Sequence, residues 1–422
     1  MSFGFTITKK EKAYLREIAK KYIEYANLPV MEERKRLWYE HNSLISSRPI
    51  IVMEHSLFEE EILPASRCDS KSAKDIERYL MSAIRNFELI NDDKVISPYF
   101  EVFWKIDLHL FGMDINRIYA EDAHGKKLGY KEEHPIVDLK KDFHKLKPSA
   151  YRVDREYTYA WKNYVEEVIG DILPVKIKNN SLFWHIAPSQ RIVELMGLEA
   201  MMYSMVDYPD EMHTLYQFVK DDIKTYISWQ EKEKLLILNN ENDFTGAGSY
   251  GFTTELPSEG LKETGTITAK DLWGNMNSQE TVGVSPEMFG AFIFPSYYDL
   301  AGKFGLVYFG CCEPVHPIWE DYISKLPGLR KVSVSPWCDE EFMGNALKGG
   351  KVIYSRKPSP NFVGVDGMFD ENAFARHIEK TLKAARGCTL EFIFRDIYTL
   401  SGDISKPGKA VKIAREMVEN IW

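Results

Sequence analysis

Residues 306–313 read LVYFGCCE: a run of apolar and aromatic side chains stops at Gly310, and two thiols and a carboxylate follow at once. The run is too short for a buried helix and is rich in β-branched and aromatic residues, so it predicts a buried strand. Gly310 lets the backbone turn or approach another group closely. Cys311, Cys312 and Glu313 therefore fall at the C-terminal end of this strand, the edge at which barrel folds carry out their chemistry.

The two adjacent cysteines allow two interpretations. A thiolate is a soft metal ligand and a nucleophile, and the neighbouring Glu313 argues against a plain apolar core. A free cysteine is also often a small buried hydrophobe, and of two neighbours on a strand one usually faces the core. Both interpretations are carried forward, with Cys311, Cys312 and Glu313 as a candidate set of metal ligands.

Length and composition are those of a soluble globular protein. The chain has 422 residues, of which 44% are hydrophobic and 28% charged, and its net charge is −9. No basic cluster is present, so we expect no binding to nucleic acid. Five cysteines in so long a chain do not indicate a disulfide framework. The N-terminus lacks a signal-peptide pattern and no run of about 18 apolar residues occurs, so we expect a cytoplasmic protein without a membrane span.

Short apolar runs alternate with helical patterns along the chain. Helical periodicity occurs at 8–36, 70–90, 157–172, 189–207, 209–233, 288–303, 317–325, 340–347, 371–386 and 407–420. The predicted strands are 49–54, 99–106, 181–186, 235–239, 306–309, 329–334, 351–355 and 389–394. Alternating strands and helices imply a parallel sheet, and this number of units suggests a (β/α)8 barrel.

We therefore predict an α/β protein with a (β/α)8 TIM-type barrel over residues 49–422. An N-terminal helical extension, residues 1–48, precedes it, and a long polar insertion at 115–152 follows the second strand. A doubly wound open sheet is the alternative, although no GxGxxG motif follows the first strand.

Polar side chains follow most of the predicted strands, and a barrel would gather them at one rim. The cations among them would hold a carboxylate or phosphate, or would pair with neighbouring acids. The carboxylates would serve as general acids or bases if burial raised a pKa. The glycine-rich stretch 244–279 is expected to be a functional loop. The rim residues are Glu54, His55, Trp184, His185, Glu241, Cys311, Cys312, Glu313, Trp337, Asp339, Arg356, Lys357, Arg395 and Asp396.

Taken together, several motifs resemble the uroporphyrinogen decarboxylase-like superfamily, in particular its corrinoid-linked methyltransferases. They are YFGCCEP at 308–314, LRKVSVSPWCD at 329–339, SRKP at 355–358, NNE at 239–241, SQE at 278–280, EFIFRD at 391–396, and Trp184-His185 with GLE at 197–199. The resemblance covers about residues 45–422 and implies the (β/α)8 barrel. The first strand, PIIVMEH, lacks the arginine pattern of the true decarboxylases, which counts against that activity.

The resemblance implies a methyltransferase that acts in anaerobic O-demethylation. It would move a methyl group from a small methylated donor, such as an aryl methyl ether, to the cobalt of a separate corrinoid protein. The corrinoid would be carried by that partner protein. Zinc is the implied metal, but either Phe309-Gly310-Cys311 or Gly310-Cys311-Cys312 stands in place of the usual His-x-Cys, and Arg395-Asp396 stands in place of the last cysteine. The ligands here would be Cys311, Cys312 and Glu313, or a variant set with Asp396.

Roles for the remaining candidates follow from the same resemblance. Glu241, Glu280 and Asp396 are the candidate catalytic acids, and the candidate substrate-binding residues are His55, Trp184, Tyr250, Trp337, Lys357 and Arg395. One alternative is a decarboxylase-like lyase that holds a tetrapyrrole or polycarboxylate through Arg356, Lys357 and Arg395. The other is a non-catalytic relative that only binds a ligand. A homodimer is one assembly that the sequence permits.

Overall fold

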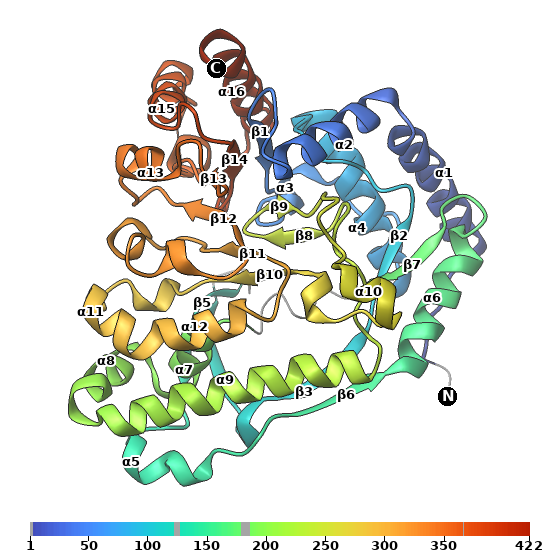
Figure 1. Cartoon of the computed structure of the whole chain (residues 1–422). Coiled ribbons are helices and arrows are strands. Elements are labelled where there is room, and N and C mark those ends of the chain that lie inside the picture. Colours follow the sequence, from blue (N-terminus) through green and yellow to red (C-terminus); the bar gives the residue numbers. More distant parts are fainter. Residues whose placement is uncertain (1–2, 122–126, 179–185, 366) are drawn as a thin grey trace.

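The computed structural model describes residues 3–121, 127–178, 186–365 and 367–422 (Figure 1). A six-stranded parallel sheet lies at its centre. In spatial order its strands are β1 (Ile50–Met53), β14 (Leu390–Phe394), β13 (Ile353–Arg356), β12 (Leu329–Val334), β11 (Leu306–Phe309) and β10 (Trp273–Met276). The first strand pairs with the last, with Ile50 opposite Glu391. Because all six are parallel, their C-terminal ends share one edge.

The predicted closed barrel is not confirmed. The described strands form the six-stranded sheet and separate two-stranded pairs, of which β2 (Phe100–Phe103) with β7 (Val175–Lys178) is parallel. The predicted strand at 181–186 lies outside the described residues except for Ile186. The prediction at 235–239 is wrong, since this apolar segment is not a strand. The side chain of Asn239 instead accepts from the backbone N–H of Trp273 at 2.9 Å and donates to its carbonyl at 3.0 Å.

The stretch predicted as a loop, 244–279, contains regular structure. Its last part holds β10, whose four residues are buried and pair with β11. Earlier in the same stretch, β8 (Phe244–Gly246) and β9 (Ser249–Tyr250) form an antiparallel hairpin, and α10 (Glu259–Thr264) follows. The loop prediction is therefore corrected to a hairpin, a short helix and an edge strand.

One face of the central sheet packs against helices (Figure 1). Alternate strand residues such as Val307, Phe309, Val332, Phe392 and Phe394 are buried in the main core with these helices, as strand alternation requires. The helices of this part are α11 (Pro286–Met288), α12 (Phe294–Ala301), α13 (Glu340–Leu347), α14 (Asn361–Gly364), α15 (Glu371–Ala384) and α16 (Lys406–Ile421).

Two helical predictions are corrected. The helix expected at 317–325 is a pair of 3-10 turns, His316–Ile318 and Ile323–Lys325. The helix expected at 189–207 breaks at Gly197, whose φ of +84° ends α7 (Pro188–Met196) before α8 (Leu198–Asp207) begins. The long helix α9 (Pro209–Lys232) follows, and α3 (Glu59–Ile62) is a single turn after β1.

The N-terminal extension consists of α1 (Lys9–Ala26) and α2 (Pro29–Asn42), with Pro29 opening the second helix. α1 packs with α4 (Lys71–Arg85) and α6 (Arg155–Ile169) around a second apolar core that also covers β2 and β7. α2 has a different position: Trp38 packs with Ile50, Val52 and Ile393 of the central sheet. The extension is thus part of the body of the molecule.

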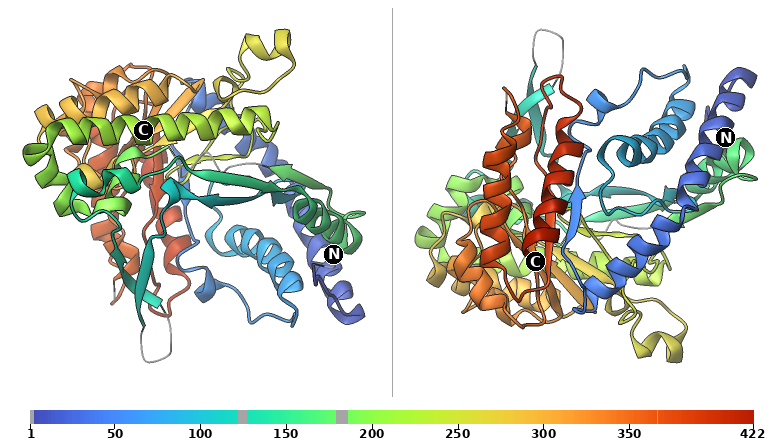
Figure 2. Two further views of the ribbon diagram at one scale, coloured as in Figure 1. Left: turned by 90° about the horizontal axis from the view of Figure 1, so that it is seen from below. Right: turned by 90° about the horizontal axis from the view of Figure 1, so that it is seen from above.

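The predicted polar insertion contains two antiparallel ribbons. β3 (Lys105–His109) pairs with β6 (Ala150–Asp154), and β4 (Asn116–Glu121) pairs with β5 (Lys127–Glu133). The β4–β5 ribbon extends to the edge of the molecule in both views of Figure 2, and the short helix α5 (Leu139–Asp142) follows it. Over the described parts of the chain, no helix has both the length and the apolar character needed to cross a membrane.

Candidate active site

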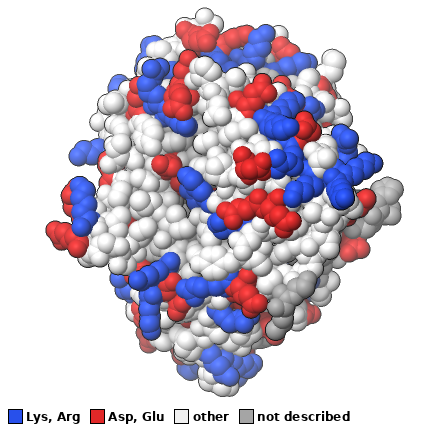
Figure 3. Space-filling view, turned by 90° about the vertical axis from the view of Figure 1, so that its right-hand side faces the viewer, with Lys and Arg blue, Asp and Glu red and all other residues white. Residues whose placement is uncertain are grey.

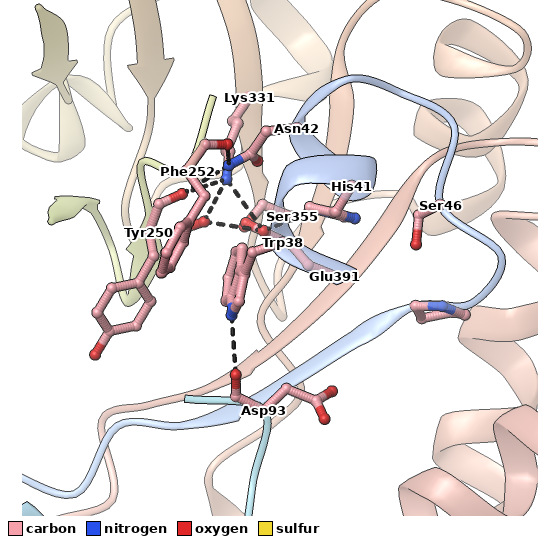
Figure 4. Close-up of polar contacts among 12 residues, drawn as sticks. Trp38, His41, Asn42, Ser46, Asp93, Tyr250, Phe252, Lys331, Ser355 and Glu391 are labelled. Carbon is pink, nitrogen blue, oxygen red and sulfur yellow. Dashed lines mark hydrogen bonds and ion pairs between the residues drawn. The ribbon is translucent and has the colours of Figure 1, made fainter. Parts of the chain in front are cut away.

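The inner face of the central sheet, opposite the helices, is polar. Lys331, Ser355 and Glu391 alternate with the apolar residues of β12, β13 and β14 and are fully buried. Glu391 accepts hydrogen bonds from Ser355 at 2.5 Å and from Ser249 at 2.9 Å, and it lies 3.1 Å from Nε2 of His41 and 3.5 Å from Nζ of Lys331 (Figure 4). Buried charges persist when they are paired in this way.

This polar network holds the glycine-rich hairpin against the inner face of the sheet. Nζ of Lys331 donates to Oγ of Ser249 at 2.7 Å and to the carbonyl of Tyr250 at 3.1 Å. Gly248 lies at φ +90°, and a Cβ there would stand 2.2 Å from Ile393. Only glycine allows so close an approach in this backbone conformation. The hairpin is therefore seated on the sheet, beneath the edge where the strands end.

The two thiols lie at that edge, beside the end of β14. Gly310, at φ +100°, turns the chain after β11, and Ser333 fixes the turn by donating to the carbonyl of Cys311 at 2.6 Å. The sulfurs of Cys311 and Cys312 are 3.5 Å apart, and Cys312 donates to Oδ2 of Asp396 at 3.3 Å. Contact with the Cys312 thiol and the charge of Arg395 lower the pKa of Cys311. Contact with Cys311, together with burial, raises the pKa of Cys312.

A cation and two carboxylates stand next to the thiols. Nε of Arg395 lies 3.3 Å from Glu54 and 3.4 Å from Asp396. Lys357, deeper in the sheet, donates to the hydroxyls of Tyr308 and Ser355, each at 2.6 Å. Burial lowers the pKa of this lysine to about 7. Of the two cations, Arg395 is the more exposed: it is half-buried, whereas Lys357 is buried.

Two further carboxyl groups lie at the ends of β10 and β11. Glu313 is buried, and its oxygens accept from the backbone N–H groups of Ser278 and Cys311, each at 2.8 Å. Glu280 is half-buried and accepts from Oγ of Ser189 at 3.0 Å. Burial and the nearby charge of Glu313 raise the pKa of Glu280. Glu280 therefore keeps its proton to a higher pH than an ordinary glutamate does.

The structure brings together one part of the predicted site. Cys311, Cys312, Glu313, Glu280, Lys357, Arg395 and Asp396 lie around the ends of β10, β11, β13 and β14. His55 and Tyr250 line a separate cavity beside β1. Glu241 is exposed and Trp337 is 73% exposed, so neither faces this group in the structure. Trp184 lies outside the described residues.

The predicted cluster of three cations does not form. Arg356 points to the helical face, because neighbouring strand residues face opposite sides. It is fully buried and donates to Glu340 at 2.9 Å and to the carbonyl of Ser335 at 2.6 Å. Lys357 is also buried, so Arg395 is the one of these three cations that is partly exposed. This geometry does not favour the polycarboxylate lyase.

The implied zinc ligands are not arranged around one point. Both oxygens of Glu313 are taken by backbone N–H groups. Within the described ranges, no group of three or more His, Cys, Asp or Glu side chains is placed to hold a metal ion. The donor set as it stands does not fit zinc, which prefers four ligands. Zinc binding stays a prediction from the resemblance, and no step proposed below uses it.

Some polar groups near the site were not expected from the sequence. Oδ1 of Asn275, Oδ1 of Asn277 and Oγ of Ser278 are buried and lack a hydrogen-bond partner among the described residues. Such atoms at a strand end mark places where a bound molecule supplies donors. The signal in the sequence is the polar NMNS run at 275–278, which the loop assignment concealed.

Comparisons with known proteins add little to this description. No protein-family model matches the chain, and no curated protein matches it. Among solved structures it is similar to a methyltransferase from Methanosarcina mazei, with 13% sequence identity, a TM-score of 0.49, and coverage of 92% of this chain and 98% of that one. We draw no conclusion about fold or function from a likeness this weak.

Proposed function

We propose that this protein is a methyltransferase that moves a methyl group from a small methylated donor, such as an aryl methyl ether, to the cobalt of a corrinoid carried by a separate protein. The observation that carries the proposal is Glu280, a half-buried carboxyl group with a raised pKa at the end of β10. A carboxyl group whose pKa is raised keeps its proton to a higher pH than usual and can donate it to a leaving oxygen.

In the proposed reaction, reduced Co(I) of the acceptor would supply the electron pair of the new carbon–cobalt bond, while the bond between the methyl carbon and the donor oxygen breaks. The electron pair left on the oxygen takes the proton of Glu280. Ser189 orients this carboxyl group by its hydrogen bond of 3.0 Å. Arg395 and the orphaned acceptors of Asn277 and Ser278 would position the donor, and holding the reactants in line supplies a large part of the rate.

Exposed apolar side chains around the same edge support a protein-borne acceptor. Trp337 after β12 is 73% exposed and Tyr398 after β14 is 69% exposed. Residues that follow the other strands and are also exposed are Leu57, Val282 and Val365. Because the strands are parallel, these loops stand at the edge that carries the thiols. Apolar surface of this kind is typical of a face that a partner protein covers.

The test combines the purified protein with a panel of methoxylated aromatic compounds and chemically reduced cobalamin as the acceptor. Methylation of cobalt is followed by the visible spectrum. Glu280→Gln should lower the rate about 100-fold, the usual weight of a general acid, whereas Glu287→Gln, which alters a carboxyl group near the start of α11, should leave it unchanged. The proposal fails if no donor methylates the acceptor, or if Glu280→Gln retains the full rate.

Metal analysis belongs to the same experiment. Protein purified without added metal is measured as wild type and as Cys312→Ser. About one zinc per chain, lost in the variant, would show that the thiols gather into a metal site that the present geometry lacks. Absence of zinc from both, with methyl transfer intact, would leave acid assistance by Glu280 as the means of activating the leaving group.

A further inference from the structure

The cavity that His55 and Tyr250 line has a volume of about 530 Å³ and lies beside β2. Its wall is built from α1, α4, β2, the segment before β2 and the β8–β9 hairpin, and includes Tyr22, Tyr79, Glu101, Asn242 and Tyr250. A cavity of this volume is large enough for a small organic ligand. The proposed methyl transfer assigns no role to it.

Three acids line this cavity: Glu59 is paired with Arg78, Asp75 is exposed, and Glu101 has no ion pair among the described residues. It lies on β2 opposite Lys176 of β7. Lys178, the next cation along β7, is bound to Asp243 at 2.7 Å, and Lys176 lies over the ring of Tyr99 at 4.1 Å. Among the described residues, no hydrogen bond reaches the Glu101 carboxyl group. Burial raises its pKa to about 7, and the charges of Lys178 and Lys176 offset only part of this effect.

The cations that line the same cavity are already engaged. Nζ of Lys94 donates to Nδ1 of His55 at 2.9 Å and lies 3.5 Å from Asp92, so its charge is matched. Arg78 is bound to Glu59 at 2.6 Å. These pairs leave the charge of Glu101 unbalanced. The cavity therefore has a surplus of negative charge.

The rest of the wall suits a cation that has an organic body. The rings of Tyr22, Tyr79 and Tyr250 line the cavity, and Figure 4 shows the ring of Tyr250 directed away from the Lys331 network. Aromatic rings attract ammonium groups through their negative faces. Oδ1 of Asn242 is buried, and the part of the chain that the structure describes offers it no donor. An acceptor and a carboxylate beside aromatic rings form a site for a ligand that donates hydrogen bonds and carries positive charge.

We propose that this cavity binds a small organic ammonium compound, with Glu101 as its counter-ion and Tyr22, Tyr79 and Tyr250 as its aromatic wall. An anionic ligand would face Glu101 without a free cation. Acidic and basic side chains are interspersed over the face shown in Figure 3, so this face does not favour one charge of ligand. Selection comes from the groups inside the cavity.

The test is calorimetric titration of the whole protein at pH 8 and low salt, without methyl donor or corrinoid. Choline and benzyltrimethylammonium are the cationic probes, 3,3-dimethylbutan-1-ol is the neutral counterpart of choline, and benzoate is the anionic probe. Choline should bind at least tenfold more tightly than the alcohol. Glu101→Gln should remove this preference, Glu101→Asp should largely keep it, and Glu167→Gln on the exposed side of α6 should not change it.

Each other outcome overturns the proposal. Equal affinity for choline and the alcohol would mean that charge is not recognised. Binding of benzoate alone would mean that Lys94 or Arg78 is available after all. Unchanged choline binding in folded Glu101→Gln, or no binding of either cation to wild type, would show that the cavity is not an ammonium site. A negative methyl-transfer assay would leave these measurements unaffected, since they need no turnover.

Discussion

The thiol of Cys312 donates a hydrogen bond to Oδ2 of Asp396 at 3.3 Å and thereby joins the loop after β11 to the loop after β14. Asp396 adopts φ +60°, a conformation uncommon outside glycine, and its other oxygen lies 3.4 Å from Arg395. A left-handed residue held by two side chains stores strain at a strand end, as is frequent at functional sites. Because the pKa of Cys311 is lowered and that of Cys312 is raised, Cys311 is the more reactive thiol of the pair.

Cys311 should therefore react first with iodoacetamide at pH 7. Its pKa is lowered by contact with the Cys312 thiol and by Arg395, so it forms the reactive thiolate more readily than an ordinary cysteine does. Arg395→Gln should raise that pKa and slow the modification several-fold. Peptide mass spectrometry after brief alkylation gives the order of reaction. The buried cysteines 68, 338 and 388 are internal controls, and faster labelling of any of them would contradict the prediction.

Glu391→Gln should destabilise the protein by about 3–5 kcal/mol, the usual cost of removing one partner of a buried ion pair. Burial alone would raise the pKa of Glu391, but Lys331 and His41 hold it well below its usual range. The amide would leave the Lys331 cation uncompensated. Urea unfolding followed by tryptophan fluorescence measures the change in the free energy of unfolding.

The matched control for this substitution is Glu379→Gln on α15, a half-buried carboxylate that pairs with Lys383 at 2.7 Å at the surface, and its loss should cost less than about 1 kcal/mol. Adding Lys331→Met to Glu391→Gln should recover most of the loss, because the unpaired charge is removed. If the double variant is no more stable than Glu391→Gln, the pair is not the source of the effect.

Gly248→Ala should destabilise the seated hairpin more than the same change at Gly349. Both glycines have positive φ, +90° and +64°, so both substitutions strain the backbone by about 1 kcal/mol. A Cβ at position 248 would lie 2.2 Å from Ile393, whereas a Cβ at position 349 would have no atom within 4 Å. Overpacking adds about 1–3 kcal/mol. Thermal unfolding of the two variants compares them directly, and equal losses would mean that the hairpin yields without cost.

The central sheet could largely be predicted from the sequence, but its edge could not. LVYF at 306–309 is continuously apolar and was predicted as a strand, as the structure confirms. β10 reads WGNM, and its glycine is required because a Cβ at 274 would stand 2.6 Å from Phe304. Because Phe304 packs so closely against position 274, that position cannot carry the apolar side chain that marks a strand. Conversely, the apolar segment 235–239 has the composition of a strand but is not one. Composition alone does not tell whether such a segment pairs with a neighbouring strand.

The polar site was predictable in its chemistry but not in its pairings. The thiols, Arg395 and Asp396 follow strands directly, and parallel strands bring such ends to one edge. The prediction that Glu241 belongs to the site failed because its two neighbours turn inward and leave it facing solvent. Asn240 donates to the carbonyl of Leu256 at 2.7 Å, and Asn242 donates to the carbonyl of Val95 at 2.8 Å. Pairings such as that of His41 with Glu391 join residues 350 positions apart, and no local pattern specifies a contact of that range.

Lys357→Met should flatten the pH dependence of stability between about pH 7 and 10. Burial lowers the pKa of Lys357 to about 7 in the folded state, whereas an unfolded lysine titrates near 10.4. Within this window the unfolded chain binds the proton and the folded chain does not, so raising the pH favours folding by up to about 1.4 kcal/mol per unit. Below pH 7 both states are protonated and this contribution is constant. Urea unfolding of wild type and variant at pH 6.5 and 9 should show the wild type gaining stability relative to the variant, and an equal response of the two would mean that the buried amine stays charged.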